Sequence, residues 1–301
     1  MSKNRAKVLE ARIYTPRILW FQTLRWLTRL LKWTLVMGII AGSGYCIWNF
    51  FEDAILHNPK YELRVVKLSK NNAFNESDVV AIGGIPLNES IFRIPVNKVE
   101  EKLRARPELT SAIVRREMPG TISIELTARQ PYAWVECRAK NMQARSRENG
   151  YLIDTEGLLY PCPPLQYDQA VVLPVVVIAE EESSLLVPGQ KVESKFMKRA
   201  MRLLALAQHT VQTDVPWFDS IQPHKTWAMK VWTRDGIEAT FGLEDHQSQL
   251  DKLLLSIKHA DHKGIQIAKI NLIPDRNLPV ILRSSNSSPL RVRPQRPAQG
   301  L

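Results

Sequence analysis

Hydrophobic and polar positions divide this chain into one long uncharged run and a series of shorter patterned segments. Residues 33–51 form nineteen consecutive positions without Asp, Glu, Lys, Arg or His. A helix of that length reaches about 28 Å, close to the roughly 30 Å hydrocarbon core of a bilayer. The run predicts an uncleaved transmembrane helix. The alternative, a cleaved signal peptide, fits less well because its apolar core is usually only about 7 to 15 residues long.

The two flanks of this run differ in charge. Residues 1–32 carry eight Lys and Arg against the single acid Glu10, a net charge of +7, whereas Glu52 and Asp53 follow the run directly. The positive-inside rule therefore predicts a basic cytoplasmic tail over 1–32 and export of residues 52–301.

Cations and apolar residues alternate at helical spacing in residues 17–32, just before the uncharged run. This pattern favours an interfacial helix running into the anchor, and a longer extension of the anchor helix would look the same. In both cases the basic side chains are expected to meet anionic lipid.

The first exported region, residues 60–130, shows the order strand, helix, helix, strand, strand. Within its last strand, Ile122, Ile124 and Leu126 alternate with polar residues, so one face of that strand is expected to be buried. The predicted elements are a strand in 63–68, helices 76–82 and 96–106, and strands 109–116 and 121–129. The pair Gly83 and Gly84 is expected to end the first helix.

A second exported region, residues 131–283, combines short strands with two amphipathic helices. The expected strands are 133–137, 151–154, 158–160, 175–178, 217–221, 227–233, 236–241, 265–272 and 278–283, and the expected helices are 195–208 and 247–259. The chain is thus predicted to be an α+β protein with one transmembrane helix. Residues 284–301, rich in Ser, Pro and Arg, are predicted to be disordered.

Charge and cysteine content narrow the function classes. Subtracting the +7 of residues 1–32 from the total of +11 leaves only +4 for the rest, which gives no electrostatic basis for nucleic-acid binding. The two exported cysteines, Cys137 and Cys162, could form a disulfide, but two free thiols are favoured.

Candidate catalytic groups are sparse. The chain contains no GxSxG, HExxH, Walker A or GxGxxG motif. His259 and His262 could share a helical face as metal ligands, yet a solvated helix end is favoured because a zinc site needs a third ligand. Asp154 in the IDTEG stretch is expected to form an Asx turn. The residues therefore predict no enzyme, no cofactor, no metal and no small-molecule substrate.

Two stretches carry a family resemblance, RPELTSAIVRREMPGTISIELTARQPYAWV and YLIDTEGLLYP. They resemble the exported region of the bacterial cell-division family FtsQ/DivIB, where a POTRA domain ends in R-x-x-P-x-T-x-x-I-x-V-x-E-R-x-P-x-A-x-W, followed by D-x-x-G. The signature positions on this chain are Arg116, Pro119, Thr121, Arg129 and Pro131.

The resemblance implies a non-catalytic, single-pass scaffold of the division septum in the inner membrane. Such a protein links cytoplasmic and exported division proteins and recruits septal peptidoglycan-synthesis components. In the family, the last strand of the second domain accepts a strand from a small coiled-coil partner, which is β-augmentation. The corresponding positions here are Leu278, Val280, Ile281, Leu282 and Arg283, with Ile270 and Leu272 in the neighbouring strand.

Three alternatives stay open. Pro279 could keep the last strand as a protected edge that never pairs with a partner. The chain could instead be a membrane-tethered POTRA protein that handles exported polypeptides. A metal-dependent wall hydrolase using His259 and His262 is the least favoured.

Overall fold

The computed structural model describes residues 16–51, 59–213 and 215–283. The predicted disordered tail, 284–301, and residues 1–15 of the predicted basic tail lie outside the described residues. Helix α1 runs without interruption over Pro16–Phe51, so the segment before the uncharged run continues the same helix and is not a separate element.

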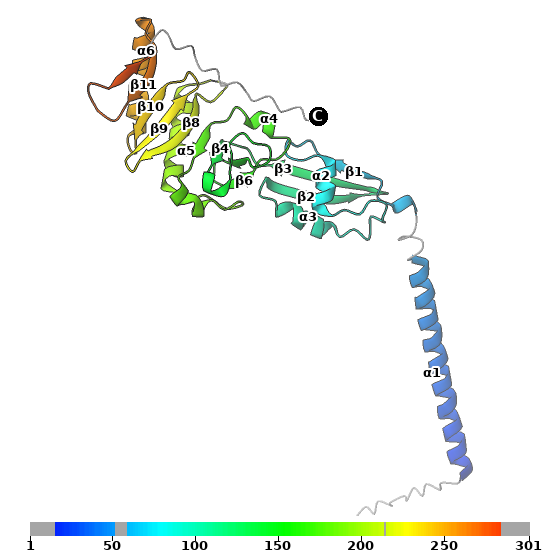
Figure 1. Ribbon diagram of the computed structural model, residues 1–301. Coiled ribbons are helices and arrows are strands. Elements are labelled where there is room, and N and C mark those ends of the chain that lie inside the picture. The colour runs from blue at the N-terminus through cyan, green and yellow to red at the C-terminus, as the bar shows by residue number, and fades with distance from the viewer. Residues whose placement is uncertain (1–15, 52–58, 214, 284–301) are drawn as a thin grey trace, which may run out of the picture.

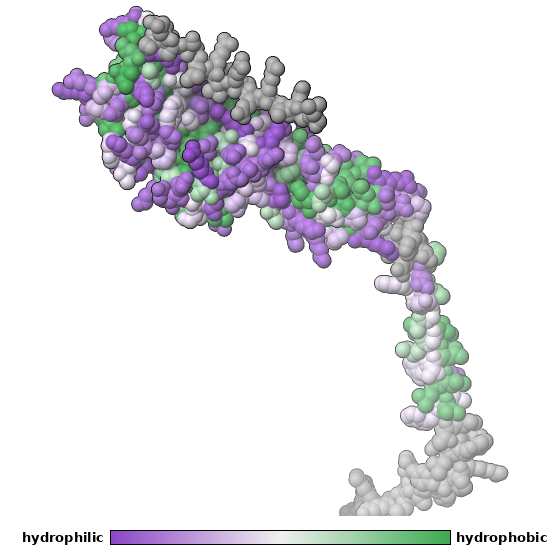
Figure 2. All heavy atoms as spheres, viewed as in Figure 1, coloured by the Kyte–Doolittle hydropathy of each residue, from purple (hydrophilic) through white to green (hydrophobic). Residues whose placement is uncertain are grey.

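Helix α1 is the one helix among the described residues that is long and apolar enough to cross a membrane. By length and composition the candidate span is Trp26–Phe50, and none of it is buried against the rest of the chain. Figure 2 shows hydrophobic side chains along this part of α1. The span begins seven residues before the predicted start and includes Arg29 and Lys32, whose long side chains can reach back toward the polar surface.

The first module has the predicted order strand, helix, helix, strand, strand. Its elements are β1 (Val65–Leu68), α2 (Glu76–Gly83), α3 (Val96–Arg104), β2 (Leu109–Glu117) and β3 (Thr121–Ala128). The sheet order is β1-β3-β2, with β1 parallel and β2 antiparallel to β3.

The predicted alternation along β3 is confirmed. Ile122, Ile124 and Leu126 are buried, and they share one hydrophobic core with Val99 and Leu103 of α3. The polar positions between the β3 residues lie on the opposite, more exposed face of the sheet. Helices therefore cover one face of this sheet and leave the other to solvent.

A nine-stranded mixed sheet forms the second module, in the order β12-β11-β10-β9-β8-β7-β4-β5-β6. Its strands are β4 (Ala133–Glu136), β5 (Tyr151–Ile153), β6 (Leu159–Pro161), β7 (Val175–Val177), β8 (Phe218–Lys225), β9 (Ala228–Thr233), β10 (Glu238–Gly242), β11 (Ile267–Asn271) and β12 (Val280–Leu282). The helices are α4 (Tyr167–Ala170), α5 (Lys195–Thr210) and α6 (His246–His262), with short 3-10 segments at Arg138–Lys140 and Glu180–Leu185. A further 3-10 segment, Pro59–Tyr61, precedes β1 of the first module.

The core of the second module lies mainly on one face of this sheet. Leu203 and Leu204 of α5 and Leu250 and Leu253 of α6 pack there. Because side chains alternate along a strand, Trp134 points to the other face, where a smaller apolar cluster forms. In Figure 1 the two modules lie end to end, with the β9–β11 region far from the entry of the chain at Pro59.

The structure departs from the predicted elements most clearly at β8. The expected strand stopped at residue 221, but β8 continues to Lys225, and Pro223 faces Met229 of β9. Pro223 and the charged residues after it have the composition of a turn. Tertiary pairing with β9 overrides that local signal.

Candidate functional site

Strand β12 ends the nine-stranded sheet and pairs only with β11 among the described strands. The N–H of Asn271 donates to the C=O of Pro279 (3.0 Å), and the N–H of Arg283 donates to the C=O of Gln266 (2.8 Å). In an antiparallel ladder, alternate residues turn both backbone groups toward the same neighbour. The backbone groups of Val280 and Leu282 therefore point away from β11.

Pro279 directly precedes β12, at a position where its missing N–H does not interrupt the outward-facing row of backbone groups. Its C=O faces β11, so the N–H that proline lacks would also have faced β11. The outward row of donors and acceptors thus loses nothing to this proline.

Side chains on β12 are exposed on both faces. Val280, Ile281 and Leu282 are all exposed, and Ile281 keeps 59% of its surface in contact with solvent. Proteins normally protect an unpaired edge strand with charged side chains or cover it with another segment, whereas this edge carries three large apolar side chains. The composition of β12 thus suits contact with another chain.

Other predicted edge residues support this strand from behind. Ile270 and Leu272, predicted in the neighbouring strand, are buried in the core, so their side chains face the core and not a partner. Leu278 is half-buried against the same core. The guanidinium of Arg283 donates to the C=O of Gly236 (3.0 Å) and fixes the end of β12 to the β9–β10 turn.

The opposite edge of this sheet is covered. At β6, the N–H of Leu159 donates to the C=O of Gln190 (3.1 Å), and its C=O accepts from Gly189 (2.7 Å). Within residues 16–51, 59–213 and 215–283, no comparable segment covers the outward groups of Val280 and Leu282. The fold therefore protects one end of the large sheet and leaves the other open.

Strand β2, at one edge of the three-stranded sheet, has outward backbone groups that are hydrogen-bonded within the chain. A carboxylate oxygen of Glu100 on α3 accepts from the N–H of Val114 (3.0 Å), and Nε of Arg104 donates to the C=O of Ala112 (3.0 Å). Side chains of α3 thus occupy groups on β2 that a partner strand would need.

The signature residues of the first module hold its loops together. Arg116 donates through Nε to the C=O of Ile91 (2.9 Å) and through Nη2 to the C=O of Ile94 (2.7 Å). Pro119 is exposed in the β2–β3 turn, and Thr121 opens β3. These positions shape the module, and none of them lies near β12 in the sheet order.

Arg129 joins the two modules. Its Nη1 lies 2.7 Å from Oδ2 of Asp154, and the two side chains are only 17% and 6% exposed. Its Nε donates to the C=O of Pro107 (3.0 Å), and its own C=O accepts from Nε2 of Gln166 (2.7 Å). The salt bridge links the end of the first module to the β5–β6 turn.

Asp154 has the Asx-turn role that its sequence context predicts. Its Oδ1 accepts from the N–H groups of Glu156 and Leu158, both at 2.9 Å. Sequence reasoning missed the ion pair with Arg129 because those residues lie 25 positions apart. The only available signal was that both residues belong to the family pattern.

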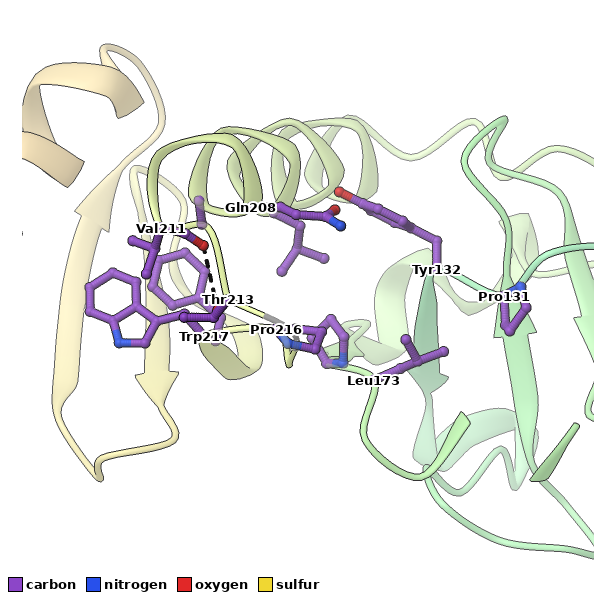
Figure 3. Close-up of a pocket in the computed structure, with 12 residues that line it drawn as sticks. Pro131, Tyr132, Leu173, Gln208, Val211, Thr213, Pro216 and Trp217 are labelled. Atoms are coloured by element: carbon purple, nitrogen blue, oxygen red, sulfur yellow. Dashed lines mark hydrogen bonds between the residues drawn. The ribbon is translucent and has the colours of Figure 1, made fainter. Parts of the chain in front are cut away.

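Pro131, the remaining signature residue, lines a cleft of about 140 Å³. Figure 3 shows Tyr132 and Gln208 on one side of it and Pro216 and Trp217 on another. Trp217 stacks on Phe218, which is fully buried, with ring centroids 5.1 Å apart. The cleft thus extends the hydrophobic core to the surface and brings together no reactive side chains.

The candidate metal ligands gain no support from the structure. His259 and His262 are both exposed near the C-terminal end of α6. In the described part of the chain, no group of three or more His, Cys, Asp or Glu side chains could hold a metal ion.

Cys137 and Cys162 are free thiols in this structure. Cys137 is buried, and Cys162 is half-buried with its pKa raised by desolvation to about 11.

Comparison with known proteins agrees with this architecture. The family model described as "POTRA domain, FtsQ-type" matches residues 62–129. The cell division protein FtsQ of Geotalea daltonii is 21% identical over 222 residues, which cover 72% of this chain and 73% of that relative. FtsQ of Streptomyces bingchenggensis is 30% identical over 137 residues, covering 45% of this chain and 46% of the relative. DivIB of Geobacillus kaustophilus is 29% identical over 92 residues, covering 31% of this chain and 34% of the relative.

The apolar N-terminal helix and the matched domain define a POTRA protein with a candidate membrane anchor. The POTRA match and these relatives together show that the chain is similar to the FtsQ/DivIB family of cell-division proteins.

Proposed function

We propose that this chain is a non-catalytic, single-pass scaffold of the division septum. Its basic N-terminus lies in the cytoplasm, and its two modules lie outside the plasma membrane. The charge difference across the apolar run supports this orientation, since cytoplasmic flanks are enriched in Lys and Arg. The resemblance to FtsQ/DivIB supports the role in recruiting septal peptidoglycan-synthesis proteins.

The scaffold acts through β12. A strand of a small coiled-coil division partner pairs with the outward groups of Val280 and Leu282, adding a tenth strand to the sheet. Backbone hydrogen bonds supply affinity, and side chains on both faces of β12 supply selectivity. The single observation that carries this proposal is an exposed apolar edge strand whose outward groups have no partner among the described residues.

Charge on the edge tests this mode of binding. Leu282→Lys should strongly reduce co-purification with the coiled-coil division partners, because the added strand would have to cover an ammonium group. The matched control is Leu255→Lys on α6, where an even more exposed leucine (71%) lies outside β12. This control should retain binding.

A backbone variant separates the side-chain effect from the strand itself. Leu282→Pro removes an outward N–H and should weaken binding without adding charge. If Leu282→Lys and Leu282→Pro bind the division partners as well as Leu255→Lys does, strand addition at β12 is wrong.

Recruitment tests the wider role. A fluorescent fusion of the full chain should collect at the division septum in cells. Uniform membrane fluorescence in dividing cells would contradict the proposed role.

A further inference from the structure

One end of the first module carries exposed apolar side chains close to the anchor. We call this surface the anchor-proximal tip and define it as residues 59–65, 87–93 and 117–120. Met118 and Leu87 keep 60% and 56% of their surface in solvent, and Val65 and Phe92 are also exposed. Exposed large apolar side chains grouped at one end of a module mark a contact surface.

Backbone contacts hold the three segments of the tip together. The N–H of Ile91 donates to the C=O of Tyr61 (2.9 Å), and the N–H of Arg64 donates to the C=O of Gly120 (3.0 Å). The rings of Tyr61 and Phe92 meet edge to face with centroids 5.5 Å apart. The apolar side chains therefore belong to one structured surface.

The anchor keeps this tip near the lipid. The candidate span ends at Phe50, α1 ends at Phe51, and the first residue of the tip is Pro59. Eight residue steps reach at most about 28 Å, even when the chain is fully extended. The tip thus stays within reach of the headgroup region at all times.

The polar residues of the tip suit a lipid surface. Lys60, Arg64 and Arg93 are exposed there, together with the exposed carboxylates of Glu89 and Glu117 and the half-buried Glu62. The carboxylate of Glu117 is paired with the ammonium group of Lys67 at 3.0 Å. Long basic side chains can lie along an apolar surface while their charged ends reach phosphate groups. The amphipathic ring of Tyr61 favours the same depth.

We infer that the anchor-proximal tip binds the outer headgroup region of the phospholipid bilayer, with Leu87, Phe92 and Met118 inserted among the lipids. This inference rests on the proposed placement of the modules outside the membrane. Contact at the tip fixes the tilt of the first module. Because the β9–β11 region lies at the other end of the molecule, the same contact holds the β12 edge away from the lipid (Figure 1).

An environment-sensitive fluorophore on the full-length protein tests the contact. The protein is placed in nanodiscs of phosphatidylcholine and phosphatidylglycerol that contain no other cellular protein. The label is attached at Met118→Cys, or at the control position Thr110→Cys, after Cys46, Cys137 and Cys162 are changed to alanine. Thr110 is exposed at the other end of β2, about 27 Å away by strand rise.

The expected result is strong quenching of the label at position 118 by nitroxide-labelled lipids and protection from aqueous iodide. The label at 110 should show the reverse. Adding Leu87→Ser and Phe92→Ser should reduce lipid quenching at 118, whereas the remote substitution Leu255→Ser should leave it unchanged.

Equal lipid and iodide quenching of the labels at positions 118 and 110 would overturn the inference and would favour a protein partner at the tip. The co-purification test with the Leu282 variants measures partner binding at β12 and does not depend on lipid contact at the tip. A failure at the tip is therefore distinguishable from a failure of the proposed scaffold function.

Discussion

The buried ion pair between Arg129 and Asp154 gives a sharp prediction about how the two modules are joined. Asp154→Asn keeps the shape of the side chain and an oxygen that can accept from the N–H groups of Glu156 and Leu158. It removes the negative charge that lies 2.7 Å from the guanidinium. Arg129 is then left largely buried without its counter-charge.

The expected cost follows from burial. Removing one partner of a buried ion pair typically costs about 3–5 kcal/mol. Arg129 is 17% exposed and keeps its hydrogen bond to the C=O of Pro107, so we expect the lower end, about 3 kcal/mol. Since each kcal/mol lowers Tm by about 2–4 °C in domains of 150–250 residues, the second module should melt about 6–12 °C lower.

The assay is thermal unfolding of the full-length protein in nanodiscs, followed by circular dichroism. A double-mutant cycle with Arg129→Ala and Asp154→Asn should give a coupling free energy of at least about 1 kcal/mol. The control cycle uses Arg147 and Asp168, which lie 2.8 Å apart but are 62% and 84% exposed. Exposed pairs of this kind contribute only about 0–1 kcal/mol. If the two cycles give the same coupling, burial does not strengthen the Arg129–Asp154 contact and the reasoning is refuted.

Two further predictions concern the supports of β12 and of α6. Gly236→Ala places a Cβ 2.8 Å from the Arg283 guanidinium at a φ of 79°, so it should weaken partner binding. The control is Gly264→Ala, at a φ of 64° with open space around it, which carries the same backbone cost of about 1–2 kcal/mol. This control should leave partner binding intact. An equal loss of binding in both variants would contradict a role for Arg283. Burial lowers the pKa of His246 below its ordinary 6.5, against a hydrogen bond with Gly242 that raises it. The unfolded chain therefore takes up a proton first, so stability should be complete above about pH 6.5 and decline as the pH falls below that value. Melting temperatures measured across this range should fall less steeply for His246→Gln, and identical slopes would exclude the histidine as the cause.

Periodicity alone was enough for the secondary structure of the first module. The alternation at Ile122, Ile124 and Leu126 identified the buried face of β3 because a strand with one wet face must alternate. The glycine pair also marked the end of α2, where Gly84 adopts a φ of 63°. Local patterns of this kind depend only on nearby residues.

The exposed edge at β12 could be identified only from the assembled sheet. Leu272 and Leu282 have the same side chain in neighbouring apolar segments, yet the first is fully buried and the second is exposed. Hydropathy cannot separate them, because burial depends on whether another strand or helix covers the position. The direction of the outward groups on β12 likewise follows from its pairing register with β11.

Composition and order along the chain were enough to predict an apolar helix of membrane-spanning length and two successive α+β regions, since these depend on transfer free energies and short-range periodicity. The ion pair between Arg129 and Asp154, the covered edge at β6 and the open edge at β12 emerged only on folding. Each depends on contacts between residues distant in the chain, which backbone pairing and side-chain packing bring together.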